Sequence, residues 1–340
     1  MKAKYEPRID LDNRTALETV IPLSSPFVLF VDPSDACNFK CRFCPTSDRD
    51  LMKSVQRPWR QMPLEIFKKI VVDMKQFKQK VRVLRLYKDG EPLLNKNLAE
   101  MVSYAKKMDV SDKIDMTTNA ALLTRDKGLA LVEAGLDRIN ISIYGVSDKN
   151  YADFSGVKIE FAKILENVKS FYDIRGECEM LVKINGDSLS EEEKKLFLEE
   201  FGDHTDKIYV ESIMSCWPNF KLRGVEVNTS QGIYGQKLQE LNVCPYPFYS
   251  MAINSDGVVS VCFLDWSRKL TIGDVRVESL IDIWAGEAMK SYQKMFLEGH
   301  RKNHPICGDC GQMTHGNADN LDEYREKILE KLVSIKYFNK

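Results

Sequence analysis

Short apolar stretches alternate with amphipathic stretches along the chain from about residue 27 to residue 213. The apolar stretches have the length of buried strands, and the stretches between them gather their apolar residues on one helical face. The predicted strands are Phe27–Val31, Val81–Tyr87, Lys113–Thr117, Arg138–Ile143, Glu179–Ile184 and Lys207–Ile213, and the predicted helices are Pro63–Phe77, Leu98–Met108, Thr124–Ala134, Phe161–Tyr172 and Glu191–Phe201.

This alternation predicts parallel βαβ units joined by right-handed crossovers. Six such strands with their helices predict an α/β fold, a partial (β/α)6 barrel of the TIM-like kind. The helix ends agree with this division. Ser190 precedes three glutamates as a helix N-cap does, and Gly135 follows Ala134 as a helix stop.

The pattern changes in the last third of the chain. A hairpin is predicted over Tyr249–Asn254 and Val258–Cys262, followed by helices over Ser279–Leu297 and Asn320–Ile335. We therefore predict five segments. They are an N-terminal extension (1–26), the barrel (27–213), a connector (214–241), a smaller domain (242–318) and a C-terminal helix (319–340).

Three cysteines, Cys37, Cys41 and Cys44, form a C-x3-C-x2-C array in the loop after the first predicted strand. Three thiolates leave one iron of a [4Fe–4S] cubane without a protein ligand, whereas ferredoxin arrays use four. Phe43 is placed to pack against a small ligand on that open iron. A zinc site and ordinary buried thiols are the alternatives, but three cysteines at this spacing do not close a tetrahedral zinc site.

This array, with an aromatic residue before its third cysteine, resembles the hallmark loop of the radical S-adenosylmethionine (SAM) enzymes. The resemblance implies that SAM chelates the open iron and is cleaved to a 5′-deoxyadenosyl radical, which abstracts hydrogen from the substrate. Cys37, Cys41 and Cys44 would then be the catalytic cluster ligands. The resemblance also implies a reductant such as flavodoxin or ferredoxin.

Three further segments resemble the SAM-binding motifs of that family. Gly90-Glu91-Pro92 follows the second strand and resembles Gly-Gly-Glu-Pro, whose glutamate holds the amino group of SAM. Asp89 replaces the first glycine, and we expect this to cost the loop backbone freedom. Thr118-Asn119 follows the third strand and Ser142 lies at the end of the fourth, so the resemblance implies that these residues contact SAM.

Two positions depart from the family pattern. Tyr144 stands where an aspartate is usual, and Ser155 stands where relatives commonly carry an arginine that pairs with the carboxylate of SAM. Lys183, at the end of the fifth strand, is a candidate replacement for that arginine. The alternative is that Lys183 is a solvated lysine.

A second cysteine group comprises Cys244, Cys262 and the pair Cys307-x2-Cys310. The predicted hairpin would bring the first two together, and a helix would return the chain with the last pair. Four thiolates can ligate a second [4Fe–4S] cluster completely, although they also suit zinc. With the segment Ser279–Trp284, this group resembles the SPASM domain in its shortened "twitch" form, which implies one auxiliary cluster.

Two clusters and SAM imply a radical SAM oxidoreductase. We expect it to oxidise an alcohol or amine carbon of a small polar substrate, such as a sugar, aminocyclitol or nucleotide-sugar, and to pass an electron to the auxiliary cluster. Radical SAM dehydrogenases of the 2-deoxy-scyllo-inosamine dehydrogenase type work in this way. Trp217 could stack on a sugar ring or pack between the domains.

Two other functions remain open. Many SPASM proteins crosslink or epimerise ribosomal peptides, but they commonly carry an N-terminal recognition domain, and only 36 residues precede Cys37. A non-catalytic two-cluster electron carrier would need no SAM pocket.

Composition narrows the partners. With 49 basic and 50 acidic residues, the chain has no charge excess suited to nucleic acid or an anionic membrane. It has neither an apolar run of membrane-spanning length nor the apolar region of a signal peptide. We therefore expect a cytoplasmic protein, in which nine cysteines indicate metal binding rather than disulfides. Cys178 and Cys216 stand apart from both groups and are expected to be ordinary buried thiols.

Overall fold

The computed structural model of the chain describes residues 1–225, 227, 230–316 and 319–339. Its strands form one sheet in the order β1-β7-β6-β5-β4-β3-β2-β8-β9-β10. The strands are β1 (Lys4–Tyr5), β2 (Val28–Val31), β3 (Val81–Arg85), β4 (Ser111–Thr118), β5 (Arg138–Ile143), β6 (Glu179–Asn185), β7 (Lys207–Glu211), β8 (Ser250–Ile253), β9 (Val258–Ser260) and β10 (Thr271–Asp274).

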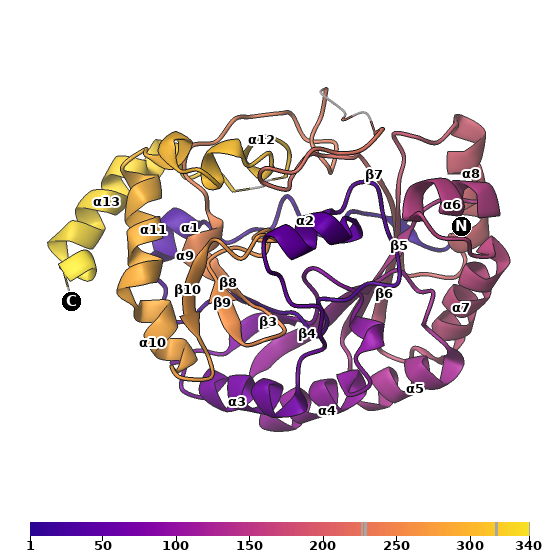
Figure 1. Cartoon of the computed structure of the whole chain (residues 1–340), viewed down its shortest axis with the longest axis horizontal. Coiled ribbons are helices and arrows are strands. Elements are labelled where there is room, and N and C mark those ends of the chain that lie inside the picture. Colours follow the sequence, from indigo (N-terminus) through magenta and orange to yellow (C-terminus); the bar gives the residue numbers. More distant parts are fainter. Residues whose placement is uncertain (226, 228–229, 317–318, 340) are drawn as a thin grey trace.

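Strands β2 to β7 are parallel neighbours and form the predicted partial barrel. The α/β fold is therefore confirmed, with strand ends shifted by a few residues. Helices follow one another around the outer face of the barrel (Figure 1). They are α3 (Leu64–Met74), α4 (Leu98–Met108), α5 (Arg125–Glu133), α7 (Phe161–Ile174) and α8 (Glu191–Phe201).

Side chains of the barrel strands alternate between an apolar outer face and a polar inner face. Leu84, Met116 and Ile139 are completely buried on the outer face. On the opposite face, Arg85 is the register partner of Asp115, which in turn is the partner of Arg138. Because these inner residues are polar, the barrel interior is not filled by apolar layers as in a closed TIM barrel. The polar inner face leaves room for cavities.

The N-terminal segment crosses the open side of the barrel. Strand β1 pairs in parallel with β7, and Arg8, just beyond it, donates from Nη1 to the Tyr87 hydroxyl at 2.6 Å. The chain then continues to α1 (Leu17–Val20) on the other side of the barrel (Figure 1). The sequence predicted an extension here and missed the strand.

The C-terminal hairpin extends the barrel sheet. The predicted hairpin is present as β8 and β9, and β8 pairs in parallel with β2. As a result, β2 is an inner strand of the sheet, and a single core cluster contains both Leu29 of the barrel and Ile253 of the hairpin. The predicted domain boundary at residue 318 lies outside the described residues.

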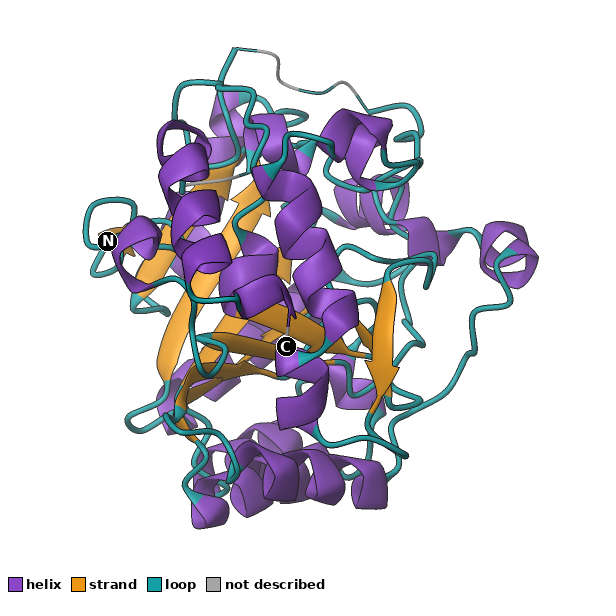
Figure 2. Cartoon of the chain, turned by 90° about the vertical axis from the view of Figure 1, so that its left-hand side faces the viewer, coloured by secondary structure: helices purple, strands orange, loops and turns teal. Residues whose placement is uncertain are grey.

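Helices of the C-terminal part lie in front of the strands when the molecule is seen from that side (Figure 2). The prediction of one helix over Ser279–Leu297 was wrong, because Gly286 is extended (φ −74°, ψ 161°) and separates α10 (Leu280–Ala285) from α11 (Glu287–Leu297). None of the helices described is long and apolar enough to cross a membrane. The remaining α-helices are α2 (Arg49–Ser54), α6 (Asp148–Ser155), α9 (Tyr246–Tyr249), α12 (Gln312–His315) and α13 (Arg325–Ser334).

Candidate functional site

The carboxyl ends of β2 to β5 surround a cavity, which we call the cysteine cavity. The predicted cysteine loop forms one wall, and the loops after β3, β4 and β5 form the others. The lining residues are Cys37, Phe39, Cys41, Phe43, Cys44, Thr46, Asp89, Gly90, Glu91, Thr117, Thr118, Asn119, Ser142, Tyr144 and Trp217. Apart from Pro92 and Lys183, the residues predicted for the first cluster and for SAM therefore line one space.

The three thiols of this cavity are unpaired and largely buried. Burial, together with the nearby Glu91 carboxylate, raises the pKa of Cys37 to about 12. Burial and then the Cys44 and Cys37 thiols raise the pKa of Cys41. Thiolates in this environment need a positive partner, and a metal centre that displaces their protons provides one.

The spacing of the sulfur atoms favours a cluster over a single metal ion. Among the described residues, the one set of three potential ligand atoms within 4.8 Å of one another consists of carboxylates and contains no cysteine. A tetrahedral zinc ion with Zn–S bonds of about 2.3 Å would hold its sulfurs about 3.8 Å apart. A cubane binds each cysteine through a different iron and so separates the sulfurs more widely.

Gly90 is required by the close approach of two loops. A Cβ atom there would lie 2.0 Å from the carbonyl oxygen of Ser34 and 2.3 Å from that of Ala36. The next residue, Glu91, donates its N–H to the same Ala36 carbonyl at 2.8 Å. The Gly-Glu-Pro segment is therefore packed directly against the chain that leads into Cys37.

Glu91 joins its own loop to the loop after β4 through its carboxylate. It accepts hydrogen bonds from the Thr118 hydroxyl at 2.7 Å, the Asn119 N–H at 2.9 Å and the Leu93 N–H at 3.1 Å. The side chain is almost completely buried, and this burial raises the pKa of Glu91. Pro92 does not line the cavity. It is buried at the start of the 3-10 helix η2 (Pro92–Leu94).

Aromatic packing explains Tyr144 in place of the usual aspartate. Its ring stacks on Phe43 with centroids 5.9 Å apart and planes 5° apart, and both rings line the cavity beside Ser142. Ser155 instead points into the fold, where its hydroxyl donates to the Tyr151 carbonyl at 2.6 Å. Ser155 therefore cannot do the work of the arginine found in relatives.

Lys183 is also not in the cysteine cavity. It pairs with Glu211 and lines a neighbouring cavity. Among the described residues that line the cysteine cavity there is no lysine or arginine. For the carboxylate of SAM, the lining of the cysteine cavity therefore provides neutral hydrogen-bond donors, such as Asn119, Ser142 and Thr46.

The second cysteine group converges as predicted. Cys244 lies just before α9, Cys262 follows β9, and Cys307 begins the 3-10 helix η4 (Cys307–Asp309), which Cys310 ends. Burial and then the thiols of Cys310 and Cys307 raise the pKa of Cys244, and burial and then the thiol of Cys244 raise that of Cys262. All four thiols are unpaired, and no three lie at zinc spacing among the described residues.

Cys216 is not isolated, contrary to expectation. Its carbonyl oxygen is 3.8 Å from the Cys310 sulfur. Burial and then the Cys310 thiol raise the pKa of Cys216, and the Cys44 thiol of the other group has a smaller effect in the same direction. Cys216 therefore lies between the two cysteine groups, while Cys178 is buried in the core as expected.

Trp217 connects the cavities. It lines the cysteine cavity, and it also lines an outer cavity to which Cys310 contributes. The position of Trp217 could not be predicted from the sequence, because the connector around it shows little periodicity and its contacts are made with distant segments.

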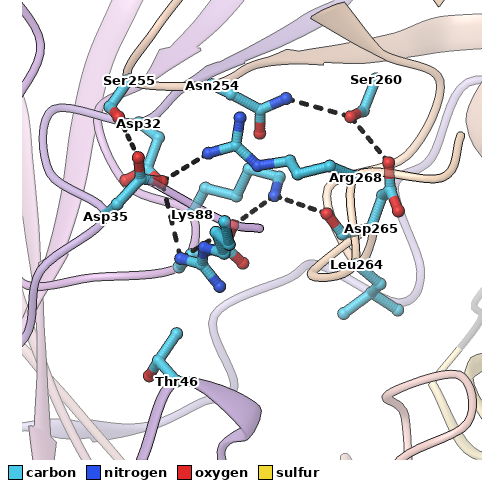
Figure 3. Close-up of polar contacts among 12 residues, drawn as sticks. Asp32, Asp35, Thr46, Lys88, Asn254, Ser255, Ser260, Leu264, Asp265 and Arg268 are labelled. Carbon is cyan, nitrogen blue, oxygen red and sulfur yellow. Dashed lines mark hydrogen bonds and ion pairs between the residues drawn. The ribbon is translucent and has the colours of Figure 1, made fainter. Parts of the chain in front are cut away.

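A buried charge network joins the cysteine loop to the C-terminal hairpin (Figure 3). Asp35 accepts hydrogen bonds from the Ser255 hydroxyl and from the Arg268 guanidinium. Lys88 donates to the Asp265 carbonyl at 3.1 Å and pairs with Asp89. Apart from the pair of neighbours Lys88 and Asp89, these contacts bridge residues more than 170 positions apart in the chain.

Asp89 belongs to this network, and the prediction that it costs backbone freedom was wrong. It is not among the non-glycine residues with positive φ. Its carboxylate pairs with Lys88 and lies 3.2 Å from Arg57, and both partners are buried. Although burial opposes ionisation, Arg57, Lys88 and then Arg268 lower the pKa of Asp89.

Asp32 completes a group of three carboxylates with Asp35 and Asp89. Burial and then the two neighbouring carboxylates raise the pKa of Asp32 well above its usual value. Because Arg57 and Arg268 already approach Asp35 and Asp89, this group is compensated by protein cations rather than arranged around a metal ion.

We predict that Asp32→Asn stabilises the protein at alkaline pH. An acid whose pKa is raised in the folded state costs stability as pH rises from its unfolded value, near 3.8, to its folded value. The neutral amide avoids that cost, so the stability gain over wild type should grow with pH. Thermal unfolding between pH 5.5 and 8.5 measures it, with the exposed Asp50→Asn as control. A gain that shrinks with rising pH would contradict this assignment.

Comparison with known proteins places these features in a family. The model of the radical SAM superfamily matches residues 31–198, and that of the SPASM iron–sulfur cluster-binding domain matches residues 244–311. The chain is 28% identical over 155 residues to a GTP 3′,8-cyclase of Staphylococcus haemolyticus, covering 41% of this chain and 40% of that protein. It spans less than half the length of the cyclases that it matches.

A second relative matches over most of both chains. The SAM-dependent 2-deoxy-scyllo-inosamine dehydrogenase of Niallia circulans is 21% identical over 294 residues, which cover 86% of this chain and 95% of that protein.

Solved structures share the fold. BtrN in complex with AdoMet and 2-DOIA has a TM-score of 0.56 at 19% identity, covering 87% of this chain and 96% of that chain. Streptococcus suis SuiB bound to the precursor peptide SuiA has a TM-score of 0.58 at 15% identity, covering 87% and 72%. The two family models together span most of the chain and both cysteine groups. The chain therefore belongs to the radical SAM superfamily and carries a C-terminal SPASM domain, with SAM and iron–sulfur clusters as its cofactors.

Proposed function

We propose that this protein is a radical SAM dehydrogenase that oxidises an alcohol or amine carbon of a small polar substrate. The observation that carries the proposal is the position of Trp217, which lines both the cysteine cavity and the outer cavity beside Cys310. A substrate against this residue lies between the two cysteine groups. Hydrogen abstraction and removal of an electron can then act on the same molecule.

The substrate space we propose is a neighbouring cavity of about 220 Å³, which we call the middle cavity. It shares Phe43, Ser142, Tyr144 and Trp217 with the cysteine cavity. Its walls are mostly apolar, with a few polar groups that could orient a ligand. This volume suits part of a small molecule better than a peptide loop.

When bound, the cluster at Cys37, Cys41 and Cys44 supplies the electron that converts SAM to the 5′-deoxyadenosyl radical, and the auxiliary cluster supplies an electron acceptor. The remaining requirement is a proton acceptor. Glu211 is the carboxylate among the described residues that line the middle cavity, and it pairs with Lys183. Loss of a hydrogen atom, a proton to Glu211 and one electron converts C–OH to C=O.

The relatives support this proposal in part. The dehydrogenase of Niallia circulans aligns over nearly its whole length, whereas the cyclases align over less than half of theirs. The resemblance in fold to BtrN agrees with the same arrangement of domains. A flavodoxin or ferredoxin would serve as the external reductant.

One observation favours a second candidate. Cys216 lines the middle cavity, and its buried thiol could return a hydrogen atom to a substrate radical. Such a donor would make the reaction a redox-neutral epimerisation, as in peptide-modifying SPASM enzymes. The two candidates differ in whether the product is oxidised.

Replacing Glu91 with glutamine should weaken SAM binding by one to two decades, because a charge-assisted hydrogen bond contributes about 1.5–3 kcal/mol. The amide retains the size of the side chain, so both clusters should remain. Equilibrium titration of the reconstituted protein with SAM measures the effect. Glu100→Gln, which changes an exposed side chain on helix α4, should bind SAM like wild type. Equal affinity of the two variants would show that Glu91 does not contact SAM.

The auxiliary cluster can be removed selectively. Wild-type protein should hold about eight irons, and a variant with Cys307→Ala and Cys310→Ala should hold about four. This variant should still cleave SAM to 5′-deoxyadenosine in the presence of substrate, but its yield of oxidised product should collapse. Cys178→Ala, which removes a thiol outside both groups, should retain eight irons and activity. Undiminished oxidation by the double variant would refute the electron-acceptor role.

A further inference from the structure

The barrel interior contains a cation-lined cavity that the proposed reaction does not use. This inner cavity has a volume of about 380 Å³ and adjoins the other two. It shares Lys183, Cys216 and Trp217 with the middle cavity, and it shares Thr117 with the cysteine cavity. Its described lining residues include five cationic side chains, Arg8, Arg14, Arg85, Lys88 and Lys183, and a single carboxylate, Asp319.

Three of these cations are neutralised by the protein. Arg14 pairs with Asp319, Lys88 with Asp89, and Lys183 with Glu211. Each of these contacts is a direct ion pair, so these side chains bring little free charge into the cavity. Arg8 and Arg85 are different.

The carboxylates near Arg8 and Arg85 do not balance the positive charge of these two side chains. Within the described residues Arg8 has no carboxylate at ion-pair distance, and Arg85 reaches Asp115 only at 3.9 Å. That same Asp115 carboxylate is engaged more closely by Arg138. The carboxylates that act on Arg8, Glu211 and Asp115, are thus each paired with another cation.

Both arginines converge on one neutral oxygen. The Tyr87 hydroxyl accepts a hydrogen bond from Arg8 Nη1 at 2.6 Å and from Arg85 Nη1 at 2.7 Å. The Nε atoms of both arginines are buried and have no hydrogen-bond partner among the described residues. Two like charges held together in a buried site repel each other, and here the one ion-pair partner, Asp115, lies 3.9 Å from Arg85 and is shared with Arg138. An anion bound beside the two guanidinium groups would offset this repulsion.

We propose that Arg8, Arg85 and Tyr87 bind a phosphate group of the substrate. Guanidinium groups present planar, paired donors that match phosphate oxygens, and two excess positive charges suit a dianion better than a carboxylate. The inference rests on the proposed function, because it narrows the substrate to a phosphorylated or nucleotide-linked sugar. A cationic aminocyclitol would be repelled here.

The position of the phosphate would direct the rest of the substrate. Thr117 and Trp217 line both the inner cavity and the cysteine cavity. A sugar phosphate anchored at Arg8 and Arg85 would therefore extend its carbon skeleton past Trp217 towards the middle cavity. The N-terminal segment, which is absent from the predicted barrel, supplies one of the two anchors.

Calorimetric titration of inorganic phosphate into the reconstituted, SAM-saturated enzyme tests the proposal. Saturation with SAM prevents phosphate from occupying the SAM site. Arg8→Gln and Arg85→Gln should each weaken phosphate binding about tenfold or more, because each removes a charge-assisted contact. Arg82→Gln is the matched control, since Arg82 lies on the same strand but is exposed and bonds Thr15 outside the barrel. Iron content verifies that each variant retains its clusters.

Absence of phosphate binding, or equal binding by all three variants, would overturn the proposal. Acetate binding as tightly as phosphate would also overturn the assignment to phosphate. A wild-type measurement covers the case in which a variant misfolds: phosphate should slow hydrogen exchange in residues 6–9 and 85–88, and unchanged exchange there would contradict the site. These results are independent of product analysis, so the phosphate site and the dehydrogenase assignment can fail separately.

Discussion

A buried ion-pair network joins the loop of Cys37, Cys41 and Cys44 to the C-terminal hairpin. The position of the two cysteine groups relative to each other depends on this network. Asp35 and Asp89 come from the barrel side, and Arg268 comes from the loop after β9. Removing an ion from water costs on the order of several kcal/mol unless a partner compensates it. Arg57 compensates both carboxylates from the barrel side, and Arg268 adds the contact that crosses to the C-terminal part. Together with the pairing of β8 with β2, this contact joins the two cysteine loops.

The polar inner face of the barrel leaves open the cavities that lie beside the two cysteine groups. Outward side chains fill the space beneath the helices, while inward side chains leave three adjoining cavities that meet at Trp217. The cysteine cavity and the middle cavity, which we propose for radical formation and for the substrate, are therefore neighbouring spaces. Asp89, which departs from the family motif, contributes to this arrangement because it pairs with Lys88, whose ammonium group reaches the Asp265 carbonyl on the C-terminal side.

Features encoded over short distances could be predicted from the sequence. The six barrel strands follow from apolar periodicity, and both cysteine groups follow from their spacing. The break at Gly286 was visible as a glycine, but helical periodicity on either side concealed it. The roles of Asp89, Arg8 and Trp217 could not be predicted, because each depends on contacts with segments distant in the chain. The contacts of the individual residues with SAM remain predictions.

Whether an electron leaves the substrate radical can be read from the mass of the product. Wild-type enzyme, reconstituted without oxygen, would be supplied with SAM, reductant and a phosphorylated sugar in deuterated water. A dehydrogenase should give a product that has lost two hydrogens and gained no deuterium at carbon. A product of unchanged oxidation state that carries one deuterium would contradict the dehydrogenase assignment and would indicate an exchangeable hydrogen donor such as the Cys216 thiol.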